Sequence, residues 1–331
     1  MNITVIGAGA WGTALAISLA AHHRVTLWAR NAAQIGEMQT THRNQRYLPD
    51  IPLPADLLLS ADLSTPLAAA DLAIIAVPTA ALRSTLQQVA LSQRSFGVVW
   101  VCKGFEAGTS LLPHQVAAGV LPERFPRGVL SGPSFAQEVA RGLPTALTLA
   151  SGDEEFARGT AQALHHPRLR IYASNDVLGV EVGGAVKNVL AIASGICDGM
   201  GLGHNARAAL LTRGLAEITR LGLKLGGRTE TLGGLSGLGD LILTCTGDLS
   251  RNRQVGLLLA QQHDLPEILR RLGHVAEGVY TVQEVHRLAQ KLGVAMPICE
   301  AVYRILYEHK PAAEMVTELL NRAPNLEFGS S

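Results

Sequence analysis

Short apolar runs and longer helical patterns alternate along the first half of the chain. Ile3–Ile6 and Val25–Ala29 predict buried strands, and the helical pattern of Thr13–Ala20 lies between them. A strand, a helix and a second strand in this order are typical of a parallel β-α-β unit. The alternation continues, so the first half predicts an α/β fold with a doubly wound sheet of the Rossmann type. Further strands are expected at Asp71–Val77, Val98–Cys102, Gly128–Ser131, Ala146–Ala150 and Leu169–Tyr172, with helices at Thr79–Val89 and Asp153–His165.

The second half is helical throughout. From Asp176 onward apolar residues recur at three- and four-residue steps, and no strand pattern stands out. This change of pattern indicates a domain boundary, so we expect a Rossmann domain over residues 1–180 and an all-α domain over residues 181–331. Helices are predicted over residues 177–196, 205–224, 250–262, 277–292 and 297–320.

Composition places the chain among globular proteins with a sizeable core, because 47% of its 331 residues are hydrophobic and 17% are charged. The formal net charge of +1 gives no electrostatic footprint for nucleic acid or an anionic membrane. The four cysteines include no C-x-x-C pair, so neither a metal site nor a disulfide framework is indicated. Such cysteine usage suits a reducing, cytoplasmic compartment.

The apolar opening of the chain, Ile3–Ala21, resembles a signal peptide only superficially. It lacks a basic beginning, and Gly7, Gly9 and Gly12 stand where a hydrophobic helix is least stable. We expect no other run to be long enough to span a bilayer. The sequence therefore predicts a soluble protein without membrane insertion.

A glycine-rich turn, Gly7-Ala8-Gly9-Ala10-Trp11-Gly12, follows the first predicted strand directly and opens the first predicted helix. In this context G-x-G-x-x-G indicates a dinucleotide site. Gly7 permits the tight turn, Gly9 lets backbone N–H groups approach the pyrophosphate, and Gly12 allows close packing of helix and strand. The diphosphate would lie at the positive end of the helix.

The end of the second predicted strand indicates which cofactor is bound. A site for NAD normally has an acidic residue here, whereas this chain has Ala29-Arg30-Asn31. A carboxylate would repel a 2′-phosphate, and Arg30 can pair with one in a bidentate way. We therefore expect NADP(H) to be preferred and NAD(H) to be tolerated.

The carboxyl ends of the predicted strands bring several candidate residues to one edge of the sheet. Gly12, Pro78, Lys103 and Ser134 all fall on this edge, where ligands of doubly wound sheets bind. Lys103 is therefore interpreted as a functional lysine, with an ordinary solvated lysine as the alternative.

Lys187 stands beside Asn188 in the predicted helix Val180–Gly195, among glycines, alanines and a serine. So many small residues indicate that another helix or a ligand packs close to the backbone. Lys187 is then either a lysine that reaches the surface from a buried helix or a proton-transfer group in a dry cleft. The dinucleotide turn favours the second interpretation.

Two segments of the second half are interpreted as loops that carry chemistry. Leu235–Asp240 contains glycines and presents one carboxylate, which could instead cap the following segment. Thr246–Arg253 opens a helix with Ser250 as its N-cap. Its arginines oppose the helix dipole, which is easier to understand if an anion lies among them. We therefore expect a phosphate site there.

With these motifs in place, the chain closely resembles bacterial NAD(P)-dependent glycerol-3-phosphate dehydrogenases. The resemblance implies reversible reduction of dihydroxyacetone phosphate to sn-glycerol 3-phosphate for phospholipid synthesis, by a homodimer. It rests on motifs in family order: Gly7–Ala14 (GAGAWGTA), Cys102–Gly104 (CKG), Leu130–Ala136 (LSGPSFA), Gly183–Asn188 (GGAVKN), Gly237–Leu241 (GLGDL) and Ser250–Asn252 (SRN).

The resemblance also implies roles for single residues. Lys187 would be the proton acceptor in oxidation, with Lys103 and Asp240 beside it, and no metal is expected. Substrate would contact Lys103, Gly132, Ser134, Lys187, Asp240, Ser250, Arg251 and Asn252. The cofactor would contact Gly7, Gly9, Ala10, Trp11, Gly12, Arg30, Pro78, Lys103, Ala136, Arg251, Val275 and Glu277.

Two rival interpretations stay open at this point. A 6-phosphogluconate or β-hydroxyacid dehydrogenase also combines a dinucleotide domain with a G-G-x-x-K-x-x-x-N helix. In this chain Asn188 follows Lys187 directly, and Ala191 stands where that pattern has its asparagine. A non-catalytic NADPH-binding module would need the glycine turn but not the set of Lys187, Asp240 and Arg251.

Overall fold

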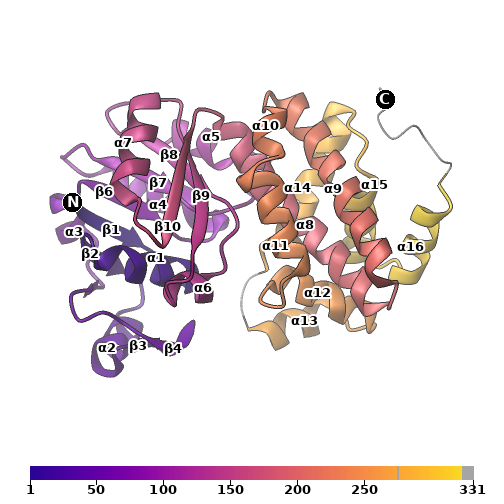
Figure 1. The fold of residues 1–331 in the computed structure, drawn as a ribbon, viewed down its shortest axis with the longest axis horizontal. Helices are drawn as coiled ribbons and strands as arrows, with labels where there is room; N and C mark the ends of the chain where they lie inside the picture. Colours follow the sequence, from indigo (N-terminus) through magenta and orange to yellow (C-terminus); the bar gives the residue numbers. More distant parts are fainter. Residues whose placement is uncertain (274–275, 323–331) are drawn as a thin grey trace.

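The sheet and the helical half of the molecule lie side by side in the computed structural model, which describes residues 1–273 and 276–322 (Figure 1). The eight-stranded sheet has the order β10-β9-β8-β7-β6-β1-β2-β5. A separate hairpin pairs β3 (Arg43–Asn44) with β4 (Leu48–Pro52). The strands of the sheet are β1 (Asn2–Ile6), β2 (Arg24–Trp28), β5 (Leu58–Ser60), β6 (Leu72–Ile75), β7 (Gly97–Trp100), β8 (Arg127–Ser131), β9 (Thr145–Ala150) and β10 (Leu169–Ser174).

Strand direction divides this sheet into two parts. From β8 to β5 every neighbouring pair is parallel, whereas β9 pairs antiparallel with β8 and parallel with β10. The carboxyl ends of β1, β6, β7 and β8 therefore meet at one edge, and those of β9 and β10 lie at the other. All predicted strands are confirmed, while the reversal at β9 leaves no trace in a hydrophobic pattern.

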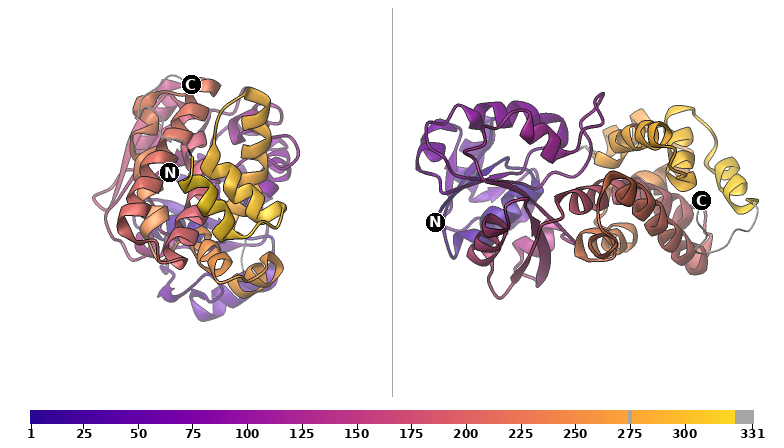
Figure 2. Two further views of the ribbon diagram at one scale, coloured as in Figure 1. Left: turned by 90° about the vertical axis from the view of Figure 1, so that its right-hand side faces the viewer. Right: turned by 90° about the horizontal axis from the view of Figure 1, so that it is seen from above.

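Helices cover both faces of the sheet, which explains why its strands are continuously apolar. Along β6, Leu72 and Ile74 pack on one face and Ala73 and Ile75 on the other. Figure 2 shows the two layers from further directions. One layer contains α1 (Ala10–Ala20), α2 (Ala32–Thr41) and α7 (Glu154–Leu164); the other contains α3 (Ser64–Ala69), α4 (Thr79–Ala90) and α5 (Pro113–Ala118).

The helical half is built around α8 (Val177–Gly199), which is buried from Gly179 to Cys197. The other helices pack around it, so α8 can be apolar on nearly all sides. The predicted division after residue 180 falls in its first turn and stays a prediction. The remaining helices are α6 (Ala136–Ala140) at the sheet edge, and then α9 (Gly203–Leu225), α10 (Thr229–Leu232), α11 (Asp240–Thr246), α12 (Arg251–Ala260), α13 (Leu265–Leu272), α14 (Glu277–Leu292), α15 (Pro297–Tyr307) and α16 (Ala312–Leu320).

Two expectations for the second half are wrong. The single helix predicted over 297–320 is broken between α15 and α16, because Pro311 disfavours helical backbone before it and His309 has a φ of 55°. The segment Leu235–Gly239 is a π-helical turn that leads into α11, not a loop. A Cβ at Gly237 would overlap the carbonyl group of Leu232, so this wide turn depends on glycine.

One helix of the described residues, α8, is long enough, and over an 18-residue window apolar enough, to cross a membrane by length and composition. The expectation that no run beyond the N-terminal one has sufficient length is therefore wrong. In the structure 89% of this window is buried inside the protein.

Candidate active site

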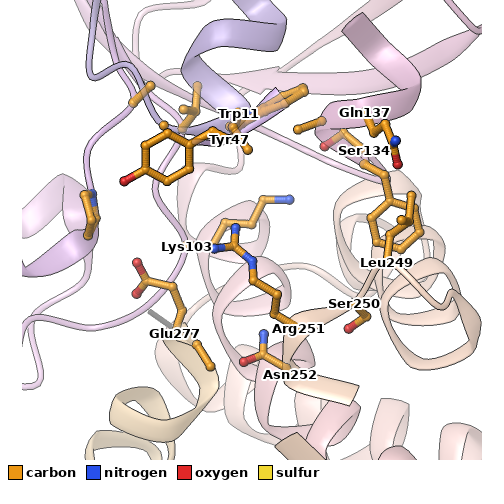
Figure 3. A pocket seen from close by; sticks show the side chains of 18 of the residues that line it. Trp11, Tyr47, Lys103, Ser134, Gln137, Leu249, Ser250, Arg251, Asn252 and Glu277 are labelled. Carbon is orange, nitrogen blue, oxygen red and sulfur yellow. The ribbon is translucent and has the colours of Figure 1, made fainter. Parts of the chain in front are cut away.

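A cavity of about 980 Å³ lies between the carboxyl edge of the sheet and the helical half (Figure 3). Both halves contribute side chains to it, and the view shows Lys103 and Arg251 pointing into the same space. Most of the residues predicted for the site line this cavity: Gly7, Gly9, Ala10, Trp11, Pro78, Lys103, Ser134, Ala136, Lys187, Ser250, Arg251, Asn252 and Glu277.

The glycine turn has the geometry that a dinucleotide requires. Gly7 has a φ of 118°, and a Cβ there would lie 2.6 Å from the carbonyl oxygen of Ala76. A Cβ at Gly12 would overlap the carbonyl oxygen of Gly7, so α1 packs directly on β1. Gly9 has open space around its Cβ position and is the N-cap of α1. These residues therefore fit a dinucleotide whose phosphates approach the N-terminus of α1.

Lys187 is buried, with a side chain that is 7% exposed, at the wall of the cavity. Its ammonium group donates hydrogen bonds to Oδ1 of Asp240 and, at 2.9 Å, to Oγ1 of Thr244. Thr244 Oγ1 in turn donates to the backbone oxygen of Asp240 at 2.6 Å. Neighbours on α11 therefore hold the lysine nitrogen in place.

A second lysine shares the same carboxylate. Lys103 Nζ lies 2.6 Å from Oδ2 of Asp240 and donates at 3.1 Å to the backbone oxygen of Gly132. This oxygen also accepts a hydrogen bond from Ser134 Oγ at 3.0 Å. Asp240 is 1% exposed, so one buried carboxylate lies between two ammonium groups.

This arrangement shifts the proton affinity of Lys187. Burial lowers the pKa of Lys187 to about 7, Asp240 opposes this shift, and the positive charge of Lys103 adds to it. A lysine with such a pKa can both give and take a proton near neutral pH.

The first turn of α12 forms another wall of the cavity. Ser250 is the N-cap and accepts a hydrogen bond from the backbone N–H of Arg253 at 3.3 Å, so its own O–H can donate elsewhere. Asn252 donates to Asn188 Oδ1 at 3.0 Å and leaves one N–H for a ligand. With the exposed Arg251 beside them, these groups can hold a dianion at a helix N-terminus.

Arg253 does not take part in this site, although the sequence suggested that several arginines converge there. Its guanidinium binds Asp198 and Asp248, at 2.8 Å and 3.0 Å. Among the residues that the structure describes, Arg251 is therefore the arginine of this turn that lines the cavity.

Four predicted residues do not line the cavity. Gly12 and Gly132 lie behind the cavity lining, and Asp240 is covered by the two lysines that it binds. Arg30 is exposed two residues after β2 and does not line the cavity. Val275 lies outside the described residues.

Several lining residues were not predicted. Thr244 follows Asp240 by one helical turn, so recognising α11 as a helix would have indicated it. Beside these residues lies Glu277, which was predicted as a cofactor contact; burial raises the pKa of its carboxyl group to about 7, and the nearby Thr79 and Arg251 oppose this shift. Further unpredicted residues of the wall are Arg46, Tyr47, Gln137 and Tyr280, for which the sequence offered no clear signal.

Comparison with known families covers both halves of the chain. A family model described as the N-terminus of NAD-dependent glycerol-3-phosphate dehydrogenase matches residues 2–157, and one described as the C-terminus of the same enzyme matches residues 176–317. A glycerol-3-phosphate dehydrogenase [NAD(P)+] from Thiobacillus denitrificans is 61% identical over 99% of this chain and 100% of its own length. One from Nitrosospira multiformis is 59% identical over 99% and 100%.

Solved structures agree. A glycerol-3-phosphate dehydrogenase from Coxiella burnetii is 45% identical, with a TM-score of 0.93 over 97% of this chain and 98% of that one. The enzyme from Saccharomyces cerevisiae is 30% identical, with a TM-score of 0.82 over 97% and 99%.

Proposed function

Because the chain belongs to the NAD-dependent glycerol-3-phosphate dehydrogenase family, we infer that it catalyses the reversible, NAD(P)-dependent reduction of dihydroxyacetone phosphate to sn-glycerol 3-phosphate. One structural observation supports this function most strongly. A buried lysine of lowered pKa, Lys187, faces a cavity that also contains a dinucleotide turn and an anion-binding helix end.

We propose that Lys187 transfers the proton. In reduction its ammonium group donates a hydrogen bond to the ketone oxygen and then gives up a proton to it. In oxidation the neutral amine accepts the proton of the hydroxyl group. Asp240 orients the lysine nitrogen. Burial keeps the pKa of Lys187 low, and Lys103 adds to this shift and contributes a second positive charge near the ketone oxygen.

The other residues bind and orient the two ligands. Bound NAD(P)H supplies the hydride. Gly7, Gly9 and Gly12 receive the diphosphate at α1, and Glu277 and Ala136 border the remaining cofactor volume. We propose that Arg30 pairs with a 2′-phosphate, which would make NADP(H) the preferred cofactor.

The phosphate of the substrate is assigned to the first turn of α12. The guanidinium of Arg251, the hydroxyl of Ser250 and the amide of Asn252 are the available donors there. Gly132 and Ser134, which surround Lys103, would border the substrate near its ketone.

Several broader assignments are proposals of the same kind. We propose a metal-free cytoplasmic enzyme without membrane insertion that acts as a homodimer and supplies phospholipid synthesis. We also propose that the Rossmann domain comprises residues 1–180 and the substrate domain residues 181–331.

The deciding experiment is NADPH oxidation by the purified protein with dihydroxyacetone phosphate. It is run beside NADH and beside unphosphorylated dihydroxyacetone. We expect fast turnover only with the phosphorylated ketone. Arg30→Ala should weaken the binding of NADPH more than the binding of NADH. Binding of NADPH without turnover on this ketone would contradict the proposal, and turnover on a 6-phosphogluconate-type hydroxyacid would favour that rival.

A further inference from the structure

The interaction between α12 and the end of α8 is a feature that the proposed chemistry does not use. Arg253 Nε donates to Asp198 Oδ2 at 2.9 Å, and Nη2 lies 2.8 Å from the same oxygen. Both side chains are largely buried, with 12% and 15% exposed. Charge-assisted hydrogen bonds of this kind are among the stronger polar contacts in a protein.

Among the described residues, this ion pair is one of two side-chain hydrogen-bonded connections between the phosphate turn, Ser250–Arg253, and α8. Asn252 bonds to Asn188, the residue next to Lys187, and Arg253 bonds to Asp198 about three helical turns further along. The first turn of α12 is therefore tied to the helix of the acid/base lysine at two separated points. Two such points restrain the first turn of α12 against sliding or rotating along α8.

Glycines bring the two helices into direct backbone contact between these points. A Cβ at Gly195 would overlap the carbonyl oxygen of Arg253, and a Cβ at Gly256 would overlap that of Ile192. Contact this close leaves no room for intervening side chains, so the ion pair acts on a rigid pair of backbones.

From these contacts we propose that Asp198 and Arg253 are positioning residues that set the spacing between the substrate phosphate and Lys187. The proposal rests on the proposed function, because it assigns the substrate phosphate to Ser250, Arg251 and Asn252. The ion pair holds these three residues at one distance from the acid/base group. It thereby selects a short phosphorylated ketone whose carbonyl reaches Lys187 when its phosphate is bound.

The test compares Asp198→Asn and Arg253→Met with the unchanged enzyme. For each protein kcat and KM are measured with dihydroxyacetone phosphate and with dihydroxyacetone, together with the Kd of NADPH. We expect kcat/KM for the phosphorylated ketone to fall by roughly 10-fold to 100-fold. The slow reduction of dihydroxyacetone and the affinity for NADPH should stay within about two-fold, and Arg253→Lys should recover part of the loss.

Asp198→Asn distinguishes positioning from a simple effect of charge. It removes a negative charge near the phosphate site, so electrostatics alone would improve binding of a dianion, whereas positioning predicts a loss. The double variant with Asp198→Asn and Arg253→Met should lose no more kcat/KM for dihydroxyacetone phosphate than the more impaired single variant.

The control is Arg207→Met. Arg207 binds the same carboxylate from α9, at 3.2 Å and 3.3 Å, but is not part of the phosphate turn, so little change is expected. Unchanged kinetics in both Asp198→Asn and Arg253→Met would overturn the proposal. Equal losses on both ketones would also overturn it. If the unchanged enzyme fails to reduce dihydroxyacetone phosphate, the proposed function itself is wrong.

Discussion

Lys187 and Lys103 both bind the carboxylate of Asp240, and most of the proposed chemistry depends on these three side chains. Asp240 is satisfied by both ammonium groups, and Thr244 holds the nitrogen of Lys187 from a second direction. A lysine held by several partners in a buried site keeps its nitrogen in one position, which is what efficient proton transfer requires. Each of these groups can be tested separately.

Replacing Lys187 by Met should remove the proton-transfer group while preserving much of the side-chain volume. We expect kcat to fall by about 10²-fold to 10⁴-fold, because general acid–base groups typically contribute that much. The Kd of NADPH should change little, since the glycine turn lies apart from this residue. Steady-state kinetics and a cofactor titration check both points, and near-normal turnover would exclude Lys187 from the mechanism.

The lowered pKa of Lys187 predicts opposite pH dependences for the two directions. Oxidation needs the neutral amine, so kcat/KM for oxidation should rise as the pH increases through about 7. Reduction needs the ammonium form, so kcat/KM for reduction should fall over the same range. Lys103→Met removes a neighbouring positive charge that helps to lower this pKa, so the rising limb of oxidation should move to higher pH. Profiles of kcat/KM between pH 5 and pH 10 measure the position of this limb in both proteins. A limb that stays in place would show that Lys187 is not the titrating group.

At the scale of elements, hydrophobic periodicity predicted seven of the eight strands of the sheet, all but the short β5, and the long helices α8, α9 and α14. It could not predict β9 running antiparallel to β8, because neighbour direction does not alter which residues are buried. It also missed the π-helical turn before Asp240. Four of the seven residues from 233 to 239 are glycine, and glycine has a low helix propensity, so this segment was interpreted as a loop. Most residues predicted for the site line one cavity, and apart from Lys187, in the middle of α8, they lie near the ends of strands or helices.

Single residues of the site were missed for a different reason. Tyr47 and Arg46 reach the cavity from the β3–β4 hairpin, whose placement depends on tertiary contacts such as the bond from Asn44 to the backbone of Ala8. Arg253 was grouped with Arg251 because sequence spacing alone cannot show that its partner is Asp198, on another helix.

The close contact of α8 and α12 predicts that Gly256 cannot be enlarged without cost. In Gly256→Ala the new methyl group would overlap the carbonyl of Ile192 and lie 2.7 Å from the backbone nitrogen of Ile196. We expect a loss of about 1–3 kcal/mol or more in unfolding free energy. Gly36→Ala, in α2 with open space around the Cβ position, is the matched control and should be neutral or stabilising by up to about 1 kcal/mol. Denaturant titration measures both, and equal effects would contradict the packing argument.

At the scale of the whole molecule, α8 joins the two halves into one packed structure. Its first turn contributes Val180 to a core on one face of the sheet, and the rest of the helix forms the centre of the second core. Glu181 strengthens this connection, because its buried carboxylate accepts hydrogen bonds from Trp100 Nε1 at 2.7 Å and from the backbone of His114 at 3.0 Å.

This connection predicts that the two halves unfold together. We expect one transition in denaturant, with the same midpoint for tryptophan fluorescence, which reports on the sheet half, and for far-ultraviolet circular dichroism. In Glu181→Leu the indole N–H of Trp100 would lose its partner, so the common midpoint should fall. Two separated transitions in the unchanged protein would show that the halves are independent.

A histidine cluster between the end of α1 and the connection from α7 to β10 predicts sensitivity to acid. The rings of His22 and His166 lie 4.7 Å apart, and His166 also contacts Ser18 Oγ at 3.0 Å. Burial, with a smaller effect of the neighbouring histidines, lowers the pKa of His166 below 6.5. The unfolded chain therefore binds more protons below this pH, and the folded state loses stability as the pH falls from about 7 to 5.

The matching measurement is Tm at pH 7.5 and pH 5.5. The Tm of His166→Gln should fall less on acidification than the Tm of the unchanged protein. His204 is exposed, so the Tm of His204→Gln should fall as much as that of the unchanged protein. An identical acid response in all three proteins would mean that the cluster does not titrate on unfolding.

The apolar character of α8 has a consequence for the synthesis of the chain. Its 23 residues are synthesised and leave the ribosome before those of α9, α11, α12 and α14, which later surround it. During that interval the nascent polypeptide exposes a segment whose hydropathy is that of a membrane span. We therefore expect this segment to need protection from aggregation until the helices that cover it are complete. A chain stopped near residue 202 should aggregate.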